Sequence, residues 1–186
     1  MRRKSGCRLH VFIFIEVMEM YKIGDIVIYG TEGLCKIVDI TEKKFGKEVI
    51  EYYVLEPVDS AASTTYVPLK NEKSLSKMRH ILKEEEILEI IKELPSDEIQ
   101  WIASDRERRQ VFRDIILFGD SKDIIKLART IHLHQKELSS KGRKLHIADE
   151  RFLKDAERMI FDEIAYVMHI DKGEVIDFIT ENINNA

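Results

Sequence analysis

The sequence has few of the residues that interrupt or cross-link a fold. It contains 3 Pro and 8 Gly in 186 residues, and its 2 cysteines, Cys7 and Cys35, form neither a CxxC pair nor a metal-binding spacing. The low Pro and Gly content argues against a long disordered or fibrous chain. Two such thiols suit a reducing cytoplasm, where Cys35 is expected to be a small core residue. We therefore expect a cytoplasmic globular protein of one or two domains.

Signatures of catalysis are also missing from the sequence. No Ser/His/Asp or Cys/His set, no carboxylate pair and no GxxxxGK[ST] loop is recognisable. His132 and His134 are two residues apart, which on a helix places them on different faces and prevents them from binding one metal ion together. We predict that the protein is not an enzyme and has no cofactor and no metal site.

The N-terminal segment is apolar but lacks the features of a signal peptide. Leu9–Val17 follows the basic residues of Met1–Lys4, yet the apolar run is short, contains Glu16 and has no small-residue cleavage site. It is also too short to span a bilayer, so no membrane partner is expected. We expect residues 1–19 to be a disordered or non-native extension and the real start to be Met20.

Residues 20–82 have the composition of short strands separated by glycine. Lys43–Lys47 looks like a hairpin tip in which Gly46 supplies a positive φ, and Pro68 indicates an edge strand. The strand-prone runs are Ile26–Ile28, Leu34–Ile40, Val49–Leu55, Thr64–Leu69 and Arg79–Leu82. Four or five strands with no helix between them predict a small antiparallel barrel or a strongly bent sheet.

After Lys83 the apolar residues recur at helical spacing, which predicts a bundle of amphipathic helices. Ser104 and Glu107 have the spacing of a capping box, so a helix should begin at Asp105, and Gly119 should end it at the C′ position. His146 is expected to cap the longest helix. The apolar stripes are Ile87–Leu94, Val111–Ile116, Ile124–Leu138, Phe152–Val167 and Val175–Ile179.

Charge is unevenly distributed along the chain. The net charge of -4 argues against a general polyanion-binding protein. Residues 99–146, however, contain 11 Lys and Arg against 6 Asp and Glu, a local charge of +5. Such a segment is either a basic patch that binds phosphates or a solvated helix face.

The strand region resembles a known module. The string Lys22–Tyr29, followed by Gly33, is similar to the polymerase-interaction module shared by CarD-type regulators and the transcription-repair coupling factor. Tyr53–Leu55 and Val67–Pro68 fall where that module has its central and edge strands. The coupling factor also needs a helicase motor, and its phosphate-binding loop is absent here, so the resemblance favours the CarD family.

The resemblance extends into the helical half and covers about residues 20–170. Gly119–Asp120, the basic loop 141–144 and Asp149–Leu153 occupy CarD-like positions. It implies an α+β protein: a small Tudor/SH3-like antiparallel β-barrel over residues 20–82, followed by an all-α helical bundle over residues 83–186. It further implies that the barrel binds the β subunit of RNA polymerase, partly by adding a strand to a sheet edge. The helical domain would then contact promoter duplex DNA at the upstream edge of the bubble, without strong sequence preference, and stabilise the open complex.

The resemblance also assigns residues to the two contacts. Lys43 falls at a basic polymerase-contact position, and Tyr66 stands where the family has a second basic residue. Arg108 matches a basic DNA-contact position. The family's tryptophan, which presses against the minor groove, would fall at Asp105, whereas the only tryptophan here, Trp101, lies four residues earlier.

The remaining candidate DNA contacts come from the residues themselves. Arginines in the first turns of a helix face the positive end of its dipole, which mildly favours a functional reason for them, and a basic glycine-containing loop suits phosphate contact. The predicted DNA-binding residues are Trp101, Arg106, Arg108, Arg109, Lys141, Arg143 and Lys144. The alternatives are that Trp101 packs in the core, which is the commoner role of tryptophan, and that any one arginine belongs to a solvated face.

Two other functions fit the sequence less well. In one, the barrel binds polymerase while the helices bind another protein instead of DNA, which suits the acidic total. In the other, a small barrel protein binds RNA, although no cluster of aromatic residues lies on a basic sheet face. In either case we expect a monomer.

Overall fold

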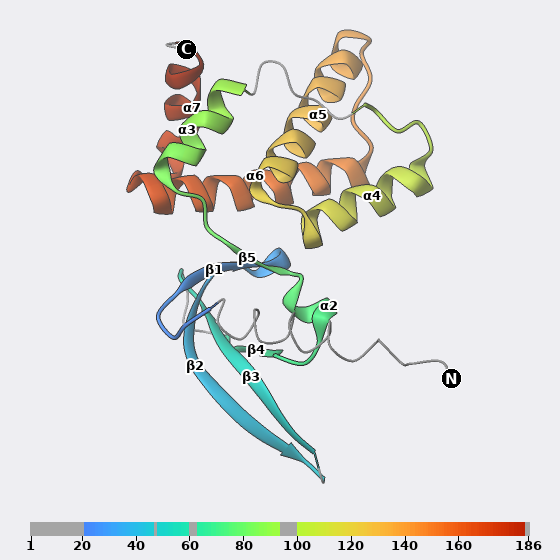
Figure 1. Ribbon diagram of the computed structural model, residues 1–186. Coiled ribbons are helices and arrows are strands. Elements are labelled where there is room, and N and C mark those ends of the chain that lie inside the picture. Colours follow the sequence, from blue (N-terminus) through green and yellow to red (C-terminus); the bar gives the residue numbers. More distant parts are fainter. Residues whose placement is uncertain (1–20, 47, 60–62, 94–99, 185–186) are drawn as a thin grey trace, which may run out of the picture.

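The structure is a computed structural model that describes residues 21–46, 48–59, 63–93 and 100–184. It is an α+β protein in which a small sheet is followed by helices (Figure 1), as the sequence predicts. The expectations for residues 1–19, for Cys7 and for a helix stop at Pro95 lie outside the described residues.

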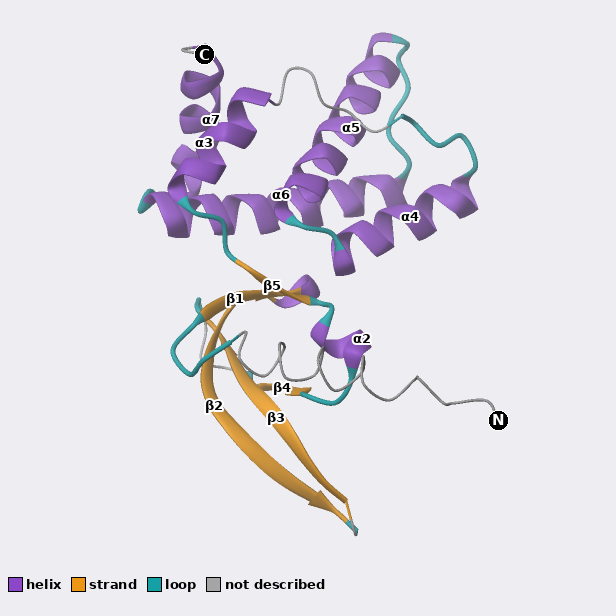
Figure 2. Cartoon of the chain, in the orientation of Figure 1, coloured by secondary structure: helices purple, strands orange, loops and turns teal. Residues whose placement is uncertain are grey.

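The sheet contains five antiparallel strands in the order β4-β3-β2-β1-β5. A 3-10 turn, η1 (Gly30–Glu32), joins β1 to β2, and the short helix α2 (Glu72–Leu75) lies between β4 and β5 (Figure 2). The strands are β1 (Ile26–Tyr29), β2 (Gly33–Phe45), β3 (Glu48–Pro57), β4 (Thr65–Pro68) and β5 (Met78–His80). The hairpin tip, with Gly46 at φ +65, and the edge position of Pro68 are both confirmed.

Of the two predicted forms, a barrel or a strongly bent sheet, the described residues form an open sheet, so a barrel is not confirmed. Within the described residues, the outermost strands β4 and β5 share no backbone pairing. Both are short, and β2 is bent by a register shift between Ile37 and Asp39. The bend brings the side chains of Val67 from β4 and Met78 from β5 into one small core with Tyr53. Side-chain packing therefore holds the two edges near each other without hydrogen bonds between them.

The helices form a layer that lies against one end of the sheet. Helix α6 is the longest, and the others pack along it (Figure 1). Their bounds are α3 (Glu84–Glu93), α4 (Asp105–Phe118), α5 (Ser121–Ser140), α6 (Ile147–Met168), the 3-10 turn η3 (Lys172–Glu174) and α7 (Val175–Asn184). No helix of the described part is long and apolar enough to cross a membrane.

The helix ends follow the capping signals of the sequence. Ser104 accepts a hydrogen bond from the backbone N–H of Glu107, and Nδ1 of His146 accepts one from the N–H of Ala148. Gly119 ends α4 as predicted, but with an extended backbone (φ -71) instead of a left-handed one. Glycine is needed there for space, because a Cβ atom would lie 2.6 Å from the carbonyl oxygen of Ile115.

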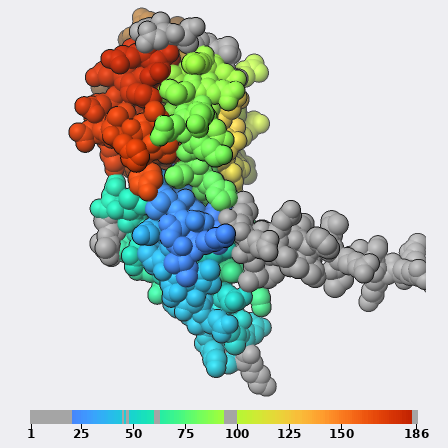
Figure 3. Space-filling model, turned by 60° about the vertical axis from the view of Figure 1, so that its left-hand side comes forward, coloured from blue at the N-terminus to red at the C-terminus, as the bar shows by residue number. Residues whose placement is uncertain are grey.

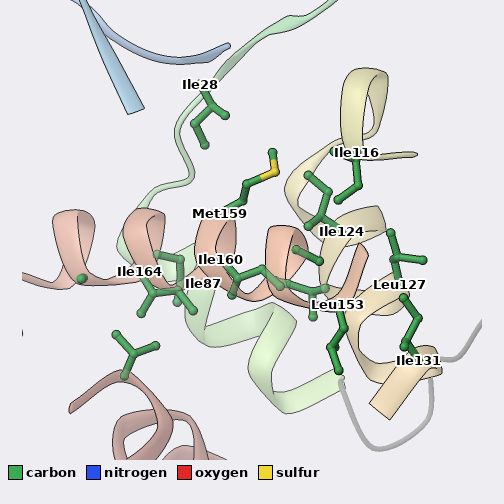
Figure 4. Close-up of a cluster of buried hydrophobic side chains, with 14 of the residues drawn as sticks. Ile28, Ile87, Ile116, Ile124, Leu127, Ile131, Leu153, Met159, Ile160 and Ile164 are labelled. Carbon is green, nitrogen blue, oxygen red and sulfur yellow. The ribbon is translucent and has the colours of Figure 1, made fainter. Parts of the chain in front are cut away.

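The sheet and the helices share part of one hydrophobic core. Ile28 of β1 and Leu34 of β2 are buried in the cluster formed by the helices, and Figure 4 shows Ile28 next to Met159 of α6. The space-filling view shows the helices resting directly on the sheet (Figure 3). The division at residues 82 and 83 stays a prediction, since apolar side chains cross it.

Candidate functional surfaces

The two predicted polymerase-contact residues lie together on one face of the sheet. The ammonium group of Lys43 (β2) is 3.1 Å from the centroid of the Tyr66 ring (β4), so the pair forms a cation–π contact that spans the intervening strand β3. Tyr66 also contacts Tyr52 of β3 edge to face, with 6.2 Å between the ring centroids. Because Tyr66 is 43% exposed, these three residues present an aromatic surface that carries a positive charge. We call them the sheet-face cluster.

An open strand edge borders the sheet-face cluster. Strand β4 pairs only with the Tyr52–Leu55 part of β3, and the N–H of Leu69 adds one bond to the carbonyl of Glu51. Backbone groups of alternate residues point the same way in a strand, so Val49 directs its N–H and C=O toward the same edge as Glu51. In the described part of the chain no strand pairs with this edge at Val49.

A cavity of about 700 Å³ lies beside this open edge. It is lined by Glu48, Val49, Ile50, Tyr52, Pro68, Lys70 and Asn71. Val49 is 42% exposed, so an incoming segment would meet an apolar side chain as well as backbone groups that no described strand pairs with. This arrangement suits the addition of an extended peptide strand.

Exposed basic side chains lie on two segments of the helical layer, the first turns of α4 and the loop that leads to α6. Arg106 and Arg109 are exposed on the first turns of α4, and Arg143 and Lys144 are exposed in the loop that leads to α6. The two segments are neighbours, as the pKa of Asp105 at the start of α4 indicates. Hydrogen bonding from Arg108 chiefly holds this pKa below its usual range, and His146, at the end of the loop, is near enough to lower it further. We call Arg106, Arg109, Arg143 and Lys144 the basic end.

Lys141 differs from the other basic residues of its loop. It follows the last turn of α5, and its ammonium group forms an ion pair with Glu137 one turn earlier. Both side chains are exposed, so the pair contributes little to stability. Part of the charge of Lys141 is therefore already neutralised.

Arg108 does not occupy the exposed position that a phosphate contact needs. Its side chain is buried, and its guanidinium donates to both carboxylate oxygens of Asp149 (3.1 and 2.9 Å) and to the carbonyl of Ile102 (2.9 Å). A further bond goes to Asp105. The expectation of a direct DNA contact conflicts with this burial. Arg108 instead joins the start of α4 to the start of α6.

Trp101 packs against the helices. Its ring stacks on His134 with 3.6 Å between the centroids, and it meets Phe112 edge to face at 6.0 Å. The guanidinium carbon of Arg108 lies 4.7 Å from the centroid of the same ring. These contacts favour the packing alternative for Trp101 over a role as a minor-groove wedge.

Three structurally important residues were given no role from the sequence. Tyr52 completes the sheet-face cluster, Asp149 is the partner of Arg108, and Glu163 is buried between the sheet and the helices. A signal for the two acids exists: both lie at helical spacing from apolar residues of α6, so they fall on its buried face. No group of three or more His, Cys, Asp or Glu side chains in the described part could hold a metal ion.

Comparison with known proteins connects the chain to transcription. Residues 21–81 match the family described as CarD-like/TRCF RID domain. Over 162 residues, the chain is also 23% identical to a protein of Bacillus subtilis (strain 168) described as "Putative transcription factor YdeB", an alignment that covers 86% of this chain and 99% of that relative. Both names point to a transcription factor and not to an enzyme. Residues 21–81, which carry the sheet and its sheet-face cluster, thus match a CarD-like/TRCF RID domain, and the two comparisons together support a CarD-like family for the chain.

Proposed function

We propose that this protein binds the β subunit of RNA polymerase through its sheet, contacts promoter duplex DNA through its basic end and thereby stabilises the open complex. A transcription-related role is supported by the family match, because RID denotes an RNA polymerase-interacting domain. The observation that carries the proposal is the contact of Lys43 with Tyr66 next to the open edge of β3.

The sheet supports binding to polymerase in two ways. The open edge at Val49 offers backbone groups that no described strand pairs with, and an extended strand of the partner would satisfy them. Lys43, held by cation–π contact against Tyr66, offers a charge in a fixed place for an acidic side chain on that strand. Tyr66, which stands where the family has its second basic residue, therefore acts by orienting Lys43.

The helical layer supports contact with DNA at the basic end. The four exposed cations of this surface come from the first turns of α4 and from the loop before α6, two segments that approach each other at Asp105 and His146. Exposed arginine and lysine side chains can contact phosphates without reading bases. This fits a protein that acts at many promoters. Acting on polymerase, the protein would work in the cytoplasm, and as a monomer.

The direct test is calorimetric titration of the full chain into the cognate polymerase β lobe. The full chain is used because Ile28 and Leu34 would be exposed in an isolated sheet. We expect binding in the micromolar range that Lys43→Glu weakens at least about tenfold, equivalent to about 1.4 kcal/mol. Lys44→Glu is the matched control, because the next residue of a strand points to the opposite face. Equal losses for both variants, or no binding by wild type, would refute the polymerase contact.

A protein-binding role for the helices is the second candidate. The burial of Arg108 and the packing of Trp101 favour it, since both residues were expected to contact DNA. Retention of the full chain on duplex DNA separates the two functions. Retention that falls steeply with added salt supports DNA contact, and no retention at low salt supports a protein partner.

A further inference from the structure

A buried carboxylate connects the sheet to the helices. Glu163, on α6, is 2% exposed. Its Oε1 atom accepts a hydrogen bond of 2.9 Å from the backbone N–H of Leu82, in the segment that leaves β5. Its Oε2 atom accepts one of 2.7 Å from the hydroxyl of Ser121, the first residue of α5. One side chain of α6 therefore holds both the exit from the sheet and the start of a neighbouring helix.

Arg79 of β5 completes this network. Its Nη1 atom donates to the hydroxyl of Ser121 and lies 3.3 Å from Oε2 of Glu163, with which it forms an ion pair. The side chains of Arg79 and Glu163 are 16% and 3% exposed. Arg79, Ser121 and Glu163 thus form a closed triangle of polar contacts, largely shielded from water, with its corners on β5, α5 and α6.

The other contacts across this junction fix its geometry less firmly. Ile28 and Leu34 bury apolar surface against the helices, but the hydrophobic effect is non-directional and tolerates sliding. Arg158 donates to the carbonyl of Thr31, and Lys172 pairs with Asp59, both at exposed positions. Exposed pairs are weak, whereas buried hydrogen bonds to a charged group are strong and directional.

We propose that Glu163, Arg79 and Ser121 form an orientation lock that fixes the angle between the sheet and the helical layer. They are positioning residues: none of them touches a partner. The use of the lock rests on the proposed function, because a protein that binds polymerase with its sheet must present its basic end at a fixed place on the DNA. The lock makes the chain a rigid spacer between two binding surfaces.

The test is a distance measurement by pulsed electron paramagnetic resonance on the full chain. Spin labels are attached to cysteines introduced at Lys36 on β2 and Lys136 on α5, both exposed, in a Cys7→Ser background. Cys35 can remain, because burial raises the pKa of its thiol to about 11 and suppresses its labelling. In the otherwise unmodified protein we expect one narrow distance distribution.

Glu163→Gln is expected to broaden that distribution about twofold, because buried polar contacts that specify one arrangement are lost. The substitution keeps the shape of the side chain but sets an amide N–H₂ or an uncharged oxygen against Arg79. Ser121→Ala removes the bridging hydroxyl with little change in volume, and it should also broaden the distance distribution. If Glu163→Gln does not fold, the Ser121→Ala variant alone tests whether the lock exists.

Glu150→Gln is the matched control, because it removes an exposed carboxylate and its ion pair with Lys154 from the same helix. This variant should keep the distribution narrow. Near-ultraviolet circular dichroism confirms that each variant is folded. The lock is overturned if the distance distribution of the folded Glu163 or Ser121 variant is as narrow as that of wild type. A broad distribution in wild type would overturn it as well.

A second readout separates the lock from the proposed function. With intact polymerase and promoter DNA, the Glu163 variant should keep its affinity for the β lobe within about twofold but shorten the lifetime of the open complex at least about fivefold relative to wild type. If wild type itself does not extend that lifetime, the proposed function fails. The distance distributions still decide whether the lock exists.

Discussion

Arg108 and Asp149 form a two-bond ion pair inside the helical layer, with bonds of 3.1 and 2.9 Å between residues 41 apart in sequence. The carboxylate and the guanidinium are almost fully shielded from water, with side-chain exposures of 2% and 5%. A pair of this kind joins the beginnings of α4 and α6, which carry the basic end between them. Loss of this pair would disturb the starts of α4 and α6, and not a contact between Arg108 and a phosphate.

Arg108→Ala should therefore lower the free energy of unfolding by about 3 kcal/mol, because it leaves Asp149 buried without a partner. Arg108→Lys should recover only part of this, since an ammonium group cannot donate two parallel bonds to one carboxylate. Urea denaturation measures both effects. Arg109→Ala is the control, and its exposed side chain predicts a change within about 0.5 kcal/mol. A fully stable Arg108→Ala protein with weakened DNA binding would restore the phosphate-contact role.

Most of the secondary structure was predictable because its signals are local. Ser104 and His146 cap their helices within a few residues of sequence, and Gly46 adopts its positive φ at the hairpin tip. Barrel closure was not predictable in this way. It depends on whether β4 and β5 meet, which the bend at Ile37 and the packing of Met78 decide together.

The candidate site was predictable in part. Lys43 and Tyr66 were expected at the same surface, and the structure joins them directly. Arg108 was expected to contact DNA or to belong to a solvated face, because nothing in the sequence indicates a buried partner for it. Asp149 supplies that partner from another helix, and a long-range pair leaves no periodic pattern in the sequence.

The packing of Trp101 predicts a stability effect for its removal. Trp101→Ala should lower the free energy of unfolding by about 2 kcal/mol, because the ring leaves a partly buried cavity beside His134 and Phe112. Trp101→Phe keeps an aromatic ring in the stack and should lose less. Thermal unfolding at fixed pH measures both. A Trp101→Ala protein of normal stability that no longer prolongs the open complex would favour the wedge role instead.

The contact of Lys43 with Tyr66 predicts coupling between the two residues in polymerase binding. Lys43→Ala and Tyr66→Ala should each weaken binding, and the double variant should lose less than the sum, by about 0.5–1 kcal/mol. Tyr66→Phe should behave like wild type, since the ring and not the hydroxyl faces the ammonium group. Calorimetric titration into the β lobe measures the cycle. Strictly additive losses would show that Tyr66 does not orient Lys43.

Burial of Cys35 predicts a loss of stability in alkali. Burial raises the pKa of this thiol from 9.0 to about 11, and Glu32 adds to the shift. Between pH 9 and pH 11 the Cys35 thiol loses its proton in the unfolded state but keeps it in the folded state. Its contribution to the free energy of unfolding is therefore fully present below pH 9 and falls as the pH rises toward 11. The loss attributable to Cys35 at pH 10.5 should be about 2 kcal/mol. In Cys35→Ala the unfolding free energy should decline less over this range; an identical decline would assign the effect to tyrosines.

The basic end predicts the salt dependence of DNA binding. If Arg143 and Lys144 each neutralise one phosphate, replacing both by Ala should make the slope of log K against log salt shallower by about 2. Lys141→Ala should change it less, because Glu137 already neutralises that ammonium group. Lys22→Ala with Lys36→Ala is the matched control, since it removes the same charge from exposed positions near the sheet. Fluorescence anisotropy of labelled duplex DNA between about 50 and 200 mM salt covers the range in which such contacts respond. If the control changes the slope as much as the loop variant does, the total charge governs binding and the basic end is not the DNA-binding surface.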